Sequence, residues 1–133
     1  DPGVLTKGDL ISAFPFPNTL VMTKITGAQI EGLFNHAAGM TNGVLQVSKS
    51  FKYVIDSNGE IKELRLNGKP INRKKTYWVA STNFVTLGGD GYWEFTESIE
   101  YEDTNIFIVD VVEDYLKDKP RYSPVYEERI VIE

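Results

Sequence analysis

The 133-residue sequence contains no cysteine, one histidine, and no apolar run near the roughly 20 residues that span a bilayer. Without cysteine the chain cannot form disulfides, thiolate metal sites or a cysteine nucleophile. Hydrolysis by a metal needs several His, Asp or Glu ligands at one site, and no HxH or HExxH cluster occurs. Serine-nucleophile and phosphate-loop motifs are missing too. We therefore expect no catalytic and no metal-binding residue in this chain, and we interpret His36 as a surface or packing residue.

The charge balance also limits the partners. Basic residues are outnumbered and the net charge is −5, which disfavours a nucleic-acid-binding role because such proteins need a basic face. The first residues, Asp1 to Val4, lack the basic and apolar regions of a signal peptide. A composition of 41% hydrophobic and 25% charged residues is typical of one ordinary globular domain. We expect no membrane span.

Two segments have capping-box spacing, in which a threonine and an Asp or Gln three residues later each bond the other's backbone. The pair Thr6 and Asp9 predicts a short helix that ends before Pro15. The pair Thr26 and Gln29 predicts a longer helix. Its apolar side chains at helical spacing are Ile30, Leu33, Phe34 and Ala37, with Gly39 as the C-terminal stop.

Between and after these helices the pattern is that of strands. The predicted strands are 19–25, 45–55, 61–66, 76–82 and 129–133. Asn58-Gly59 predicts a hairpin, whereas Asn67-Gly68 is expected to open a longer connection through Lys69-Pro70. Thr104 is predicted to cap a last helix that runs to about Lys117. Its inner face would be Ile108, Val109, Val112, Tyr115 and Leu116. The predicted fold is a single α+β domain, a mixed sheet with flanking helices.

One segment with a possible binding role is Phe14-Pro15-Phe16-Pro17-Asn18. Two prolines fix the backbone of this loop, so a phenylalanine in it can be held rigidly with its ring face available. The alternative, which composition alone favours, is that Phe14 and Phe16 both fill the core.

The other candidate segment is Ser81 to Tyr92, where a strand leads into Gly88-Gly89-Asp90-Gly91. Glycines allow the backbone to approach a ligand closely, and a carboxylate placed among them can accept hydrogen bonds from a sugar diol. A tight turn with a solvated aspartate explains the pattern equally well.

Together these segments resemble the C-terminal domain of the family that contains 5′-nucleotidases, UDP-sugar hydrolases and 2′,3′-cyclic nucleotide phosphodiesterases. The order and spacing of the motifs are more specific than any one of them. The matching motifs are Leu5-Thr6-Lys7-Gly8-Asp9-Leu10, Phe14-Pro15-Phe16-Pro17-Asn18-Thr19, Ile25-Thr26-Gly27-Ala28-Gln29-Ile30, Gly43-Val44-Leu45-Gln46-Val47-Ser48, Leu66-Asn67-Gly68-Lys69-Pro70-Ile71 and Asn83-Phe84 through Gly88-Gly89-Asp90-Gly91-Tyr92.

The resemblance implies that two phenylalanines clamp the nucleobase while an aspartate of the glycine loop contacts the nucleoside. The positions that match are Phe16, Asn18, Phe84, Gly89 and Asp90. Two positions depart from the family pattern. A proline, Pro17, stands where the family commonly has glycine, and Lys49 follows Ser48 where the family has Ser-Gly.

The resemblance also implies a larger parent enzyme. It places an N-terminal metallophosphatase domain with two divalent metals of the zinc or manganese type, and an N-G-G-G-I-R segment, before Asp1. We expect residues 1–133 to be the substrate-binding domain of a periplasmic, cell-surface or secreted nucleotide hydrolase, inactive when isolated, with AMP- or adenosine-like ligands. The alternative is a non-catalytic surface or partner-binding module that keeps the fold.

Overall fold

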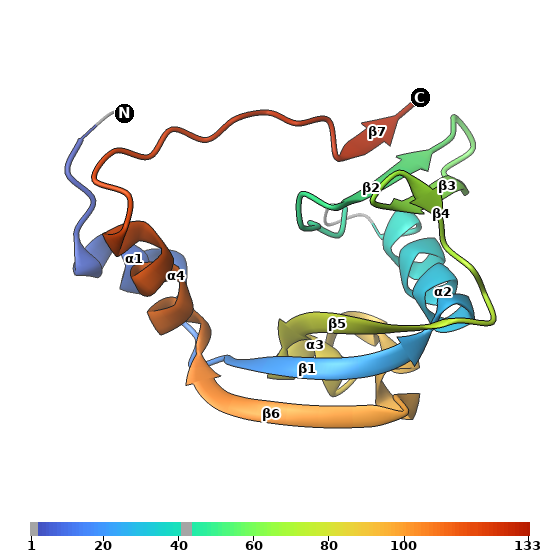
Figure 1. Cartoon of the computed structure of the whole chain (residues 1–133), viewed down its shortest axis with the longest axis horizontal. Helices are drawn as coiled ribbons and strands as arrows, with labels where there is room; N and C mark the ends of the chain where they lie inside the picture. Colours follow the sequence, from blue (N-terminus) through green and yellow to red (C-terminus); the bar gives the residue numbers. More distant parts are fainter. Residues whose placement is uncertain (1–2, 41–43) are drawn as a thin grey trace.

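A computed structural model describes residues 3–40 and 44–133 of the chain. The helices are α1 (Lys7–Ala13), α2 (Gly27–Ala38), α3 (Asn83–Thr86) and α4 (Ile108–Lys117), with two 3₁₀ helices, η1 (Gly89–Gly91) and η2 (Trp93–Glu97). The strands are β1 (Thr19–Thr26), β2 (Phe51–Ile55), β3 (Ile61–Leu66), β4 (Lys69–Pro70), β5 (Thr76–Thr82), β6 (Glu100–Phe107) and β7 (Ile130–Ile132). This is the expected α+β domain, with its strands divided between two sheets (Figure 1).

The first sheet has the order β5-β1-β6 and is antiparallel throughout. Its central strand, β1, buries every second residue, and Val21, Thr23 and Ile25 are each fully buried. This period of two is expected because successive side chains of a strand point to opposite faces. The buried face of β1 packs against α3, η2 and the start of α2, which fixes where the ends of β1 and β5 lie.

The second sheet has the order β4-β3-β2-β7 and is mixed, because β2 and β7 run parallel. Asn58-Gly59 forms the predicted hairpin between β2 and β3. Asn67 and Gly68 both have positive φ, of 50° and 77°, and form a tight turn after which Lys69-Pro70 pairs back on β3 as β4. The longer connection that we predicted at this point begins only after β4.

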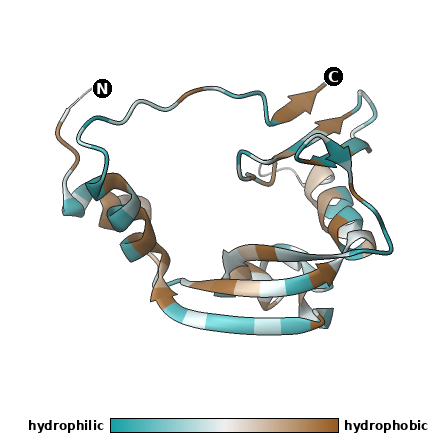
Figure 2. Cartoon of the chain, viewed as in Figure 1, coloured by the Kyte–Doolittle hydropathy of each residue, from teal (hydrophilic) through white to brown (hydrophobic). Residues whose placement is uncertain are grey.

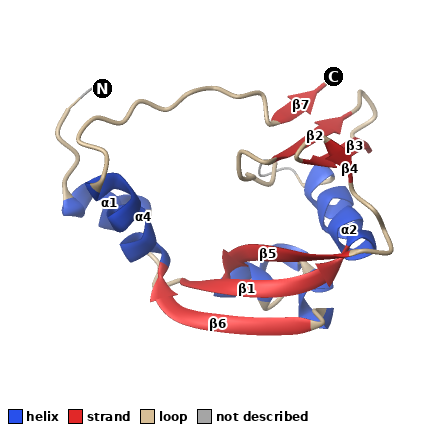
Figure 3. Ribbon diagram, in the orientation of Figure 1, coloured by secondary structure: helices blue, strands red, loops and turns tan. Residues whose placement is uncertain are grey.

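Helix α2 joins the two sheets (Figure 3). Its predicted capping box is present, with the Gln29 N–H donating to Thr26 Oγ1 at 3.1 Å. Its predicted apolar face is buried in one cluster with Ile25 of β1 and with Tyr53 of β2. Gly27 lies so close to the connection after β4 that a Cβ on it would stand 2.1 Å from the carbonyl oxygen of Asn72. The helix is therefore held at its start by backbone contact and along its length by the core.

The prediction of the last helix was wrong at its start. Residues up to Phe107 belong to β6, and α4 begins at Ile108. Thr104 does not cap a helix, because its Oγ1 donates to the carbonyl of Leu20 in β1 at 2.7 Å. Pairing with β1 therefore overrides the local cap signal. On the predicted inner face, Tyr115 is exposed.

The predicted strand 45–55 was also too long, since β2 begins at Phe51. The preceding residues 44–48 follow the core without pairing, and the carbonyl of Leu45 accepts a hydrogen bond from the buried Tyr53 hydroxyl at 2.7 Å. Gly43, which opens one of the family motifs, lies outside the described residues.

After α4 the chain crosses from the α1–α4 end of the molecule to the second sheet, where it forms β7 (Figure 1). Residues along this path and on the two helices leave apolar side chains in solvent, and Figure 2 shows both hydrophobic and hydrophilic residues on α4. Val4, Ile11, Tyr115 and Tyr126 are all more than half exposed. The accessible area is 9266 Å². A compact monomer of this mass, 15.0 kDa, has roughly 7,000 Å².

Alkaline conditions provide a test of the core at Tyr53. Burial raises the pKa of Tyr53 to about 12, and the neighbouring Tyr92 adds to the rise. The folded protein therefore favours the protonated hydroxyl of Tyr53. Its contribution to the free energy of unfolding is complete below pH 10, the pKa of tyrosine in the unfolded chain, and is lost as the pH rises from about 10 to about 12. In urea titrations at about pH 8 and pH 11, we expect the free energy of unfolding to fall less for Tyr53→Phe than for wild type. An equal fall in the two proteins would contradict this. At about pH 8 the variant should be about 1 kcal/mol less stable, because the Leu45 carbonyl loses its donor.

Candidate nucleoside-binding site

The two predicted aromatic residues come from the same end of the first sheet. Phe16 lies shortly before β1, and Phe84 lies in α3 directly after β5. Because β1 and β5 are antiparallel, with Leu20 opposite Thr82, the start of one strand lies beside the end of the other. The two segments are also bonded, since the backbone N–H of Thr19 donates to Asn83 Oδ1 at 3.1 Å.

The loop that carries Phe16 is tied down by its backbone. The N–H of Asn18 donates to the carbonyl of Phe16 at 2.8 Å, and the carbonyl of Asn18 accepts from the N–H of Ile108 at 2.9 Å. Phe16 is 73% exposed and Phe14 is 39% exposed. The interpretation that both rings fill the core was therefore wrong. Asn18, half-buried, links the loop to the start of α4.

Phe84 sits in the first turn of α3. Thr82 caps this helix, and Asn83 Oδ1 accepts the N–H of Phe84 at 3.0 Å. The ring is 51% exposed, and its other side rests against the glycine loop. A Cβ on Gly89 would lie 2.5 Å from the carbonyl oxygen of Phe84 and 2.7 Å from its ring carbon Cε1. A side chain at position 89 would collide with Phe84, so the close approach of the two residues requires glycine there.

Asp90 projects from the turn η1 and is exposed. Its φ is +55°, in the left-handed region that non-glycine residues rarely adopt, and both Gly88 and Gly91 also have positive φ. The tight turn that we considered for this segment is therefore present. Burial raises the pKa of the neighbouring Tyr92, and the negative charge of Asp90 raises it further.

We did not predict that His36 contributes to this region. His36 of α2 has its Nε2 2.7 Å from the carbonyl oxygen of Asp90, and its ring meets Tyr92 edge-on with centroids 5.0 Å apart. His36 is thus a packing residue, as expected, that also bonds the glycine loop. Nothing in the sequence indicates the contact, because 54 positions separate His36 from Asp90.

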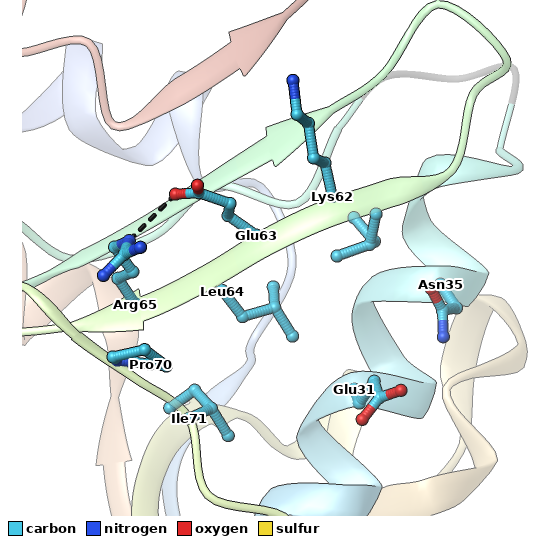
Figure 4. Close-up of a pocket in the computed structure, with 9 residues that line it drawn as sticks. Glu31, Asn35, Lys62, Glu63, Leu64, Arg65, Pro70 and Ile71 are labelled. Carbon is cyan, nitrogen blue, oxygen red and sulfur yellow. Dashed lines mark hydrogen bonds and ion pairs between the residues drawn. The ribbon is translucent and has the colours of Figure 1, made fainter.

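Two hollows among the described residues lie away from the predicted site residues. One of about 410 Å³ lies between α2 and β3 (Figure 4), and all five predicted residues lie outside its lining. Its charged residues pair with others, Arg65 with Glu63 at 2.9 Å and Glu31 with Arg73. A second, of about 300 Å³, is an apolar cleft between the two sheets whose lining includes Phe34, Phe51 and Val85. Phe16 and Phe84 line neither hollow, and both are exposed.

The described residues do not fit a metal centre. Across residues 3–40 and 44–133 no group of three or more His, Cys, Asp or Glu side chains converges. The ring of His36 bonds the carbonyl oxygen of Asp90 through Nε2 and packs against Tyr92. No helix within the same ranges is long and apolar enough to cross a bilayer.

Comparison with known proteins places this chain in a family. The family model described as "5′-nucleotidase, C-terminal domain" matches residues 1–97. The chain belongs to the 5′-nucleotidase C-terminal domain family. The match includes all five predicted site residues.

Three curated relatives match almost the whole chain, and two of them are named for nucleotide hydrolysis. The chain is 30% identical over 127 residues to protein UshA of Yersinia enterocolitica, covering 94% of this chain and 22% of the relative. It is 34% identical over 145 residues to the trifunctional nucleotide phosphoesterase protein YfkN of Bacillus subtilis, covering 98% of this chain and 10% of the relative. A snake venom 5′-nucleotidase of Naja atra is 28% identical, with 97% of this chain and 27% of the relative covered. The chain thus spans about a quarter or less of the length of these relatives.

A solved structure agrees with the family assignment. The crystal structure of a 5′-nucleotidase precursor from Thermus thermophilus superimposes with a TM-score of 0.87 at 28% identity, covering 96% of this chain and 28% of that one. The NAD nucleotidase of Haemophilus influenzae has the same fold, with a TM-score of 0.83 at 22% identity over 98% of this chain and 27% of its own. The predicted fold class is therefore confirmed. The names of the relatives support a hydrolase family.

Proposed function

We propose that this domain recognises the nucleoside part of a nucleotide, with the base held between the rings of Phe16 and Phe84. The observation that carries the proposal is that both exposed rings come from one end of the first sheet, where the Thr19–Asn83 hydrogen bond ties their segments together. Asp90 is proposed to accept hydrogen bonds from the ribose. Gly89 sets the Phe84 ring, and Asn18 fixes the loop of Phe16.

The expected affinity of the chain alone is low. Stacking of a base on an aromatic ring contributes roughly 1–3 kcal/mol per ring, so two rings supply roughly 2–6 kcal/mol. Even a millimolar complex needs about 4 kcal/mol after the cost of association. Stacking accepts any base, so we propose broad base specificity.

We propose that phosphate-ester hydrolysis takes place on a separate N-terminal metallophosphatase domain of the same polypeptide, which would hold two divalent metals. The greater length of the relatives and their names support this division. So does the surplus of roughly 2,000 Å² of exposed surface over a compact monomer of this size. The chain alone should be inactive. By analogy with the venom relative, we place the whole enzyme in the periplasm, at the cell surface or outside the cell, in nucleotide catabolism.

Nuclear magnetic resonance tests the binding proposal. Adenosine or AMP, added to millimolar concentration, should shift the signals of Phe16, Phe84 and Asp90, whereas inorganic phosphate should not. Unchanged signals at these residues would contradict the proposal.

The exposed apolar residues of α1, α4 and the crossing segment also favour a second candidate, a non-catalytic module that binds another protein. The same titration, together with an assay for a bound protein partner, distinguishes the two functions. A stable protein partner together with no nucleoside binding would favour the module, and saturable adenosine binding would favour nucleoside recognition.

A further inference from the structure

We infer that His36 is a positioning residue of the nucleoside site, holding the glycine loop in the conformation that presents Asp90 and supports Phe84. This inference rests on the proposed function for its ligand. The contact joins helix α2, which belongs to the core, to an exposed turn. The Asp90 carbonyl oxygen can only accept a hydrogen bond, so His36 Nε2 carries the proton and donates across 2.7 Å.

The loop needs an external support because its own conformation is unfavourable. Asp90 has φ +55°, and Gly88 and Gly91 on either side have φ +92° and +82°. Strained backbone of this kind persists only where the surroundings hold it. Two backbone hydrogen bonds close the turn, from the N–H of Gly91 to the carbonyl of Gly88 at 3.1 Å and from the N–H of Tyr92 to the carbonyl of Gly89 at 3.3 Å, and neither involves the carbonyl of Asp90. Within residues 88–91, Asp90 is the non-glycine residue with positive φ and is exposed, and the hydrogen bond from His36 is made to its carbonyl.

The histidine ring also fits the turn by shape. A Cβ on Gly91 would lie 2.9 Å from two atoms of the His36 ring, so the ring lies directly against the backbone of the loop. Its edge-on contact with Tyr92 fixes the orientation of the ring plane. The loop therefore packs against two side chains, His36 at Gly91 and Phe84 at Gly89.

A displacement of the loop would reach both ligand-binding groups. Moving Asp90 changes the position of its carboxylate directly. Moving Gly89 changes the backbone surface against which the Phe84 ring lies. His36 thus acts on the ligand through two residues without touching it. A residue that merely stabilised the core would leave the geometry of this exposed turn unchanged.

Two variants of the 133-residue chain separate the hydrogen bond that His36 donates from the packing of its ring, and a third variant is the control. His36→Phe keeps a ring against Gly91 and Tyr92 but removes the donor. His36→Gln removes the ring but can place an amide N–H where Nε2 was. Asn35→Ala, on the exposed neighbour in the same helix, is the matched control. For each, two quantities are measured by nuclear magnetic resonance: the backbone order parameters of Gly89 to Gly91 without ligand, and the dissociation constant for adenosine.

The expected result is that His36→Phe lowers the order parameters at Asp90 and Gly91 from about 0.85 toward 0.6. It should also weaken adenosine binding about 5- to 10-fold, the equivalent of one hydrogen bond. His36→Gln should restore most of both quantities, and Asn35→Ala should change neither.

Unchanged loop order and unchanged affinity in a folded His36→Phe variant would overturn the inference. So would equal losses in His36→Gln and His36→Phe, because the donor would then not matter. If the wild-type chain fails to bind adenosine, the proposed function fails. The ligand-free order parameters still decide whether His36 holds the turn.

Discussion

Replacing Phe84 with alanine is expected to weaken adenosine binding by roughly 5- to 150-fold, because a base stacked on one aromatic ring gains about 1–3 kcal/mol. The ring is half exposed, and no part of the buried core depends on it, so the fold should survive. The backbone of the residue should keep its hydrogen bond to Asn83. The change would be measured as a shift of the dissociation constant in a titration monitored by nuclear magnetic resonance.

The matched control is Tyr126→Ala, which removes another exposed aromatic ring, 84% exposed and on the segment that crosses to β7. This variant should bind adenosine as wild type does. If Phe84→Ala and Tyr126→Ala have equal affinities, the base does not stack on Phe84 and the clamp is wrong.

A single methyl group on the glycine loop should have a comparable effect on binding. In Gly89→Ala the new Cβ would stand 2.5 Å from the carbonyl oxygen of Phe84 and 2.7–2.8 Å from two of its ring carbons. Real contacts are never this short, so either the loop or the ring must move. We expect roughly tenfold weaker adenosine binding, since displacement forfeits the stacking of one ring. Overpacking should also cost about 1–3 kcal/mol of stability.

Gly39→Ala provides the control for this substitution. At Gly39, the C-cap of α2, a Cβ would meet nothing closer than 3.6 Å and φ is −82°, which alanine adopts without strain. Its affinity should equal that of wild type and its stability should not fall. Wild-type affinity in a folded Gly89→Ala variant would show that the Phe84 ring does not depend on Gly89.

Local signals predicted the parts of the fold that local interactions determine. Both capping boxes form as predicted, since each joins residues only three apart. The strands 61–66 and 76–82 were predicted with their observed bounds. The start of α4 was wrong because the capping signal at Thr104 competes with pairing to β1, where Thr104 bonds Leu20 across 84 positions. A sequence pattern contains no information on that partner.

The same distinction applies to the site. The proline-fixed loop and the glycine turn were recognisable as segments, but the placement of Phe16 and Phe84 at one end of the first sheet depends on the antiparallel register of β1 and β5. The exposure of Phe16 could not be predicted either, because an aromatic residue between two prolines fits the core as well as the surface. The bond from His36 to Asp90 depends on the packing of α2 against the loop. The ligand roles of Phe16, Asn18, Phe84, Gly89 and Asp90 remain predictions.

The most direct test of the clamp is a measurement of nuclear Overhauser effects between adenosine and the chain. With the ligand at saturating concentration, the base protons H2 and H8 should show effects to the ring protons of both Phe16 and Phe84. The ribose protons should show effects to Asp90 instead. Effects from the base to only one ring, or to neither, would contradict a base held between the two phenylalanines.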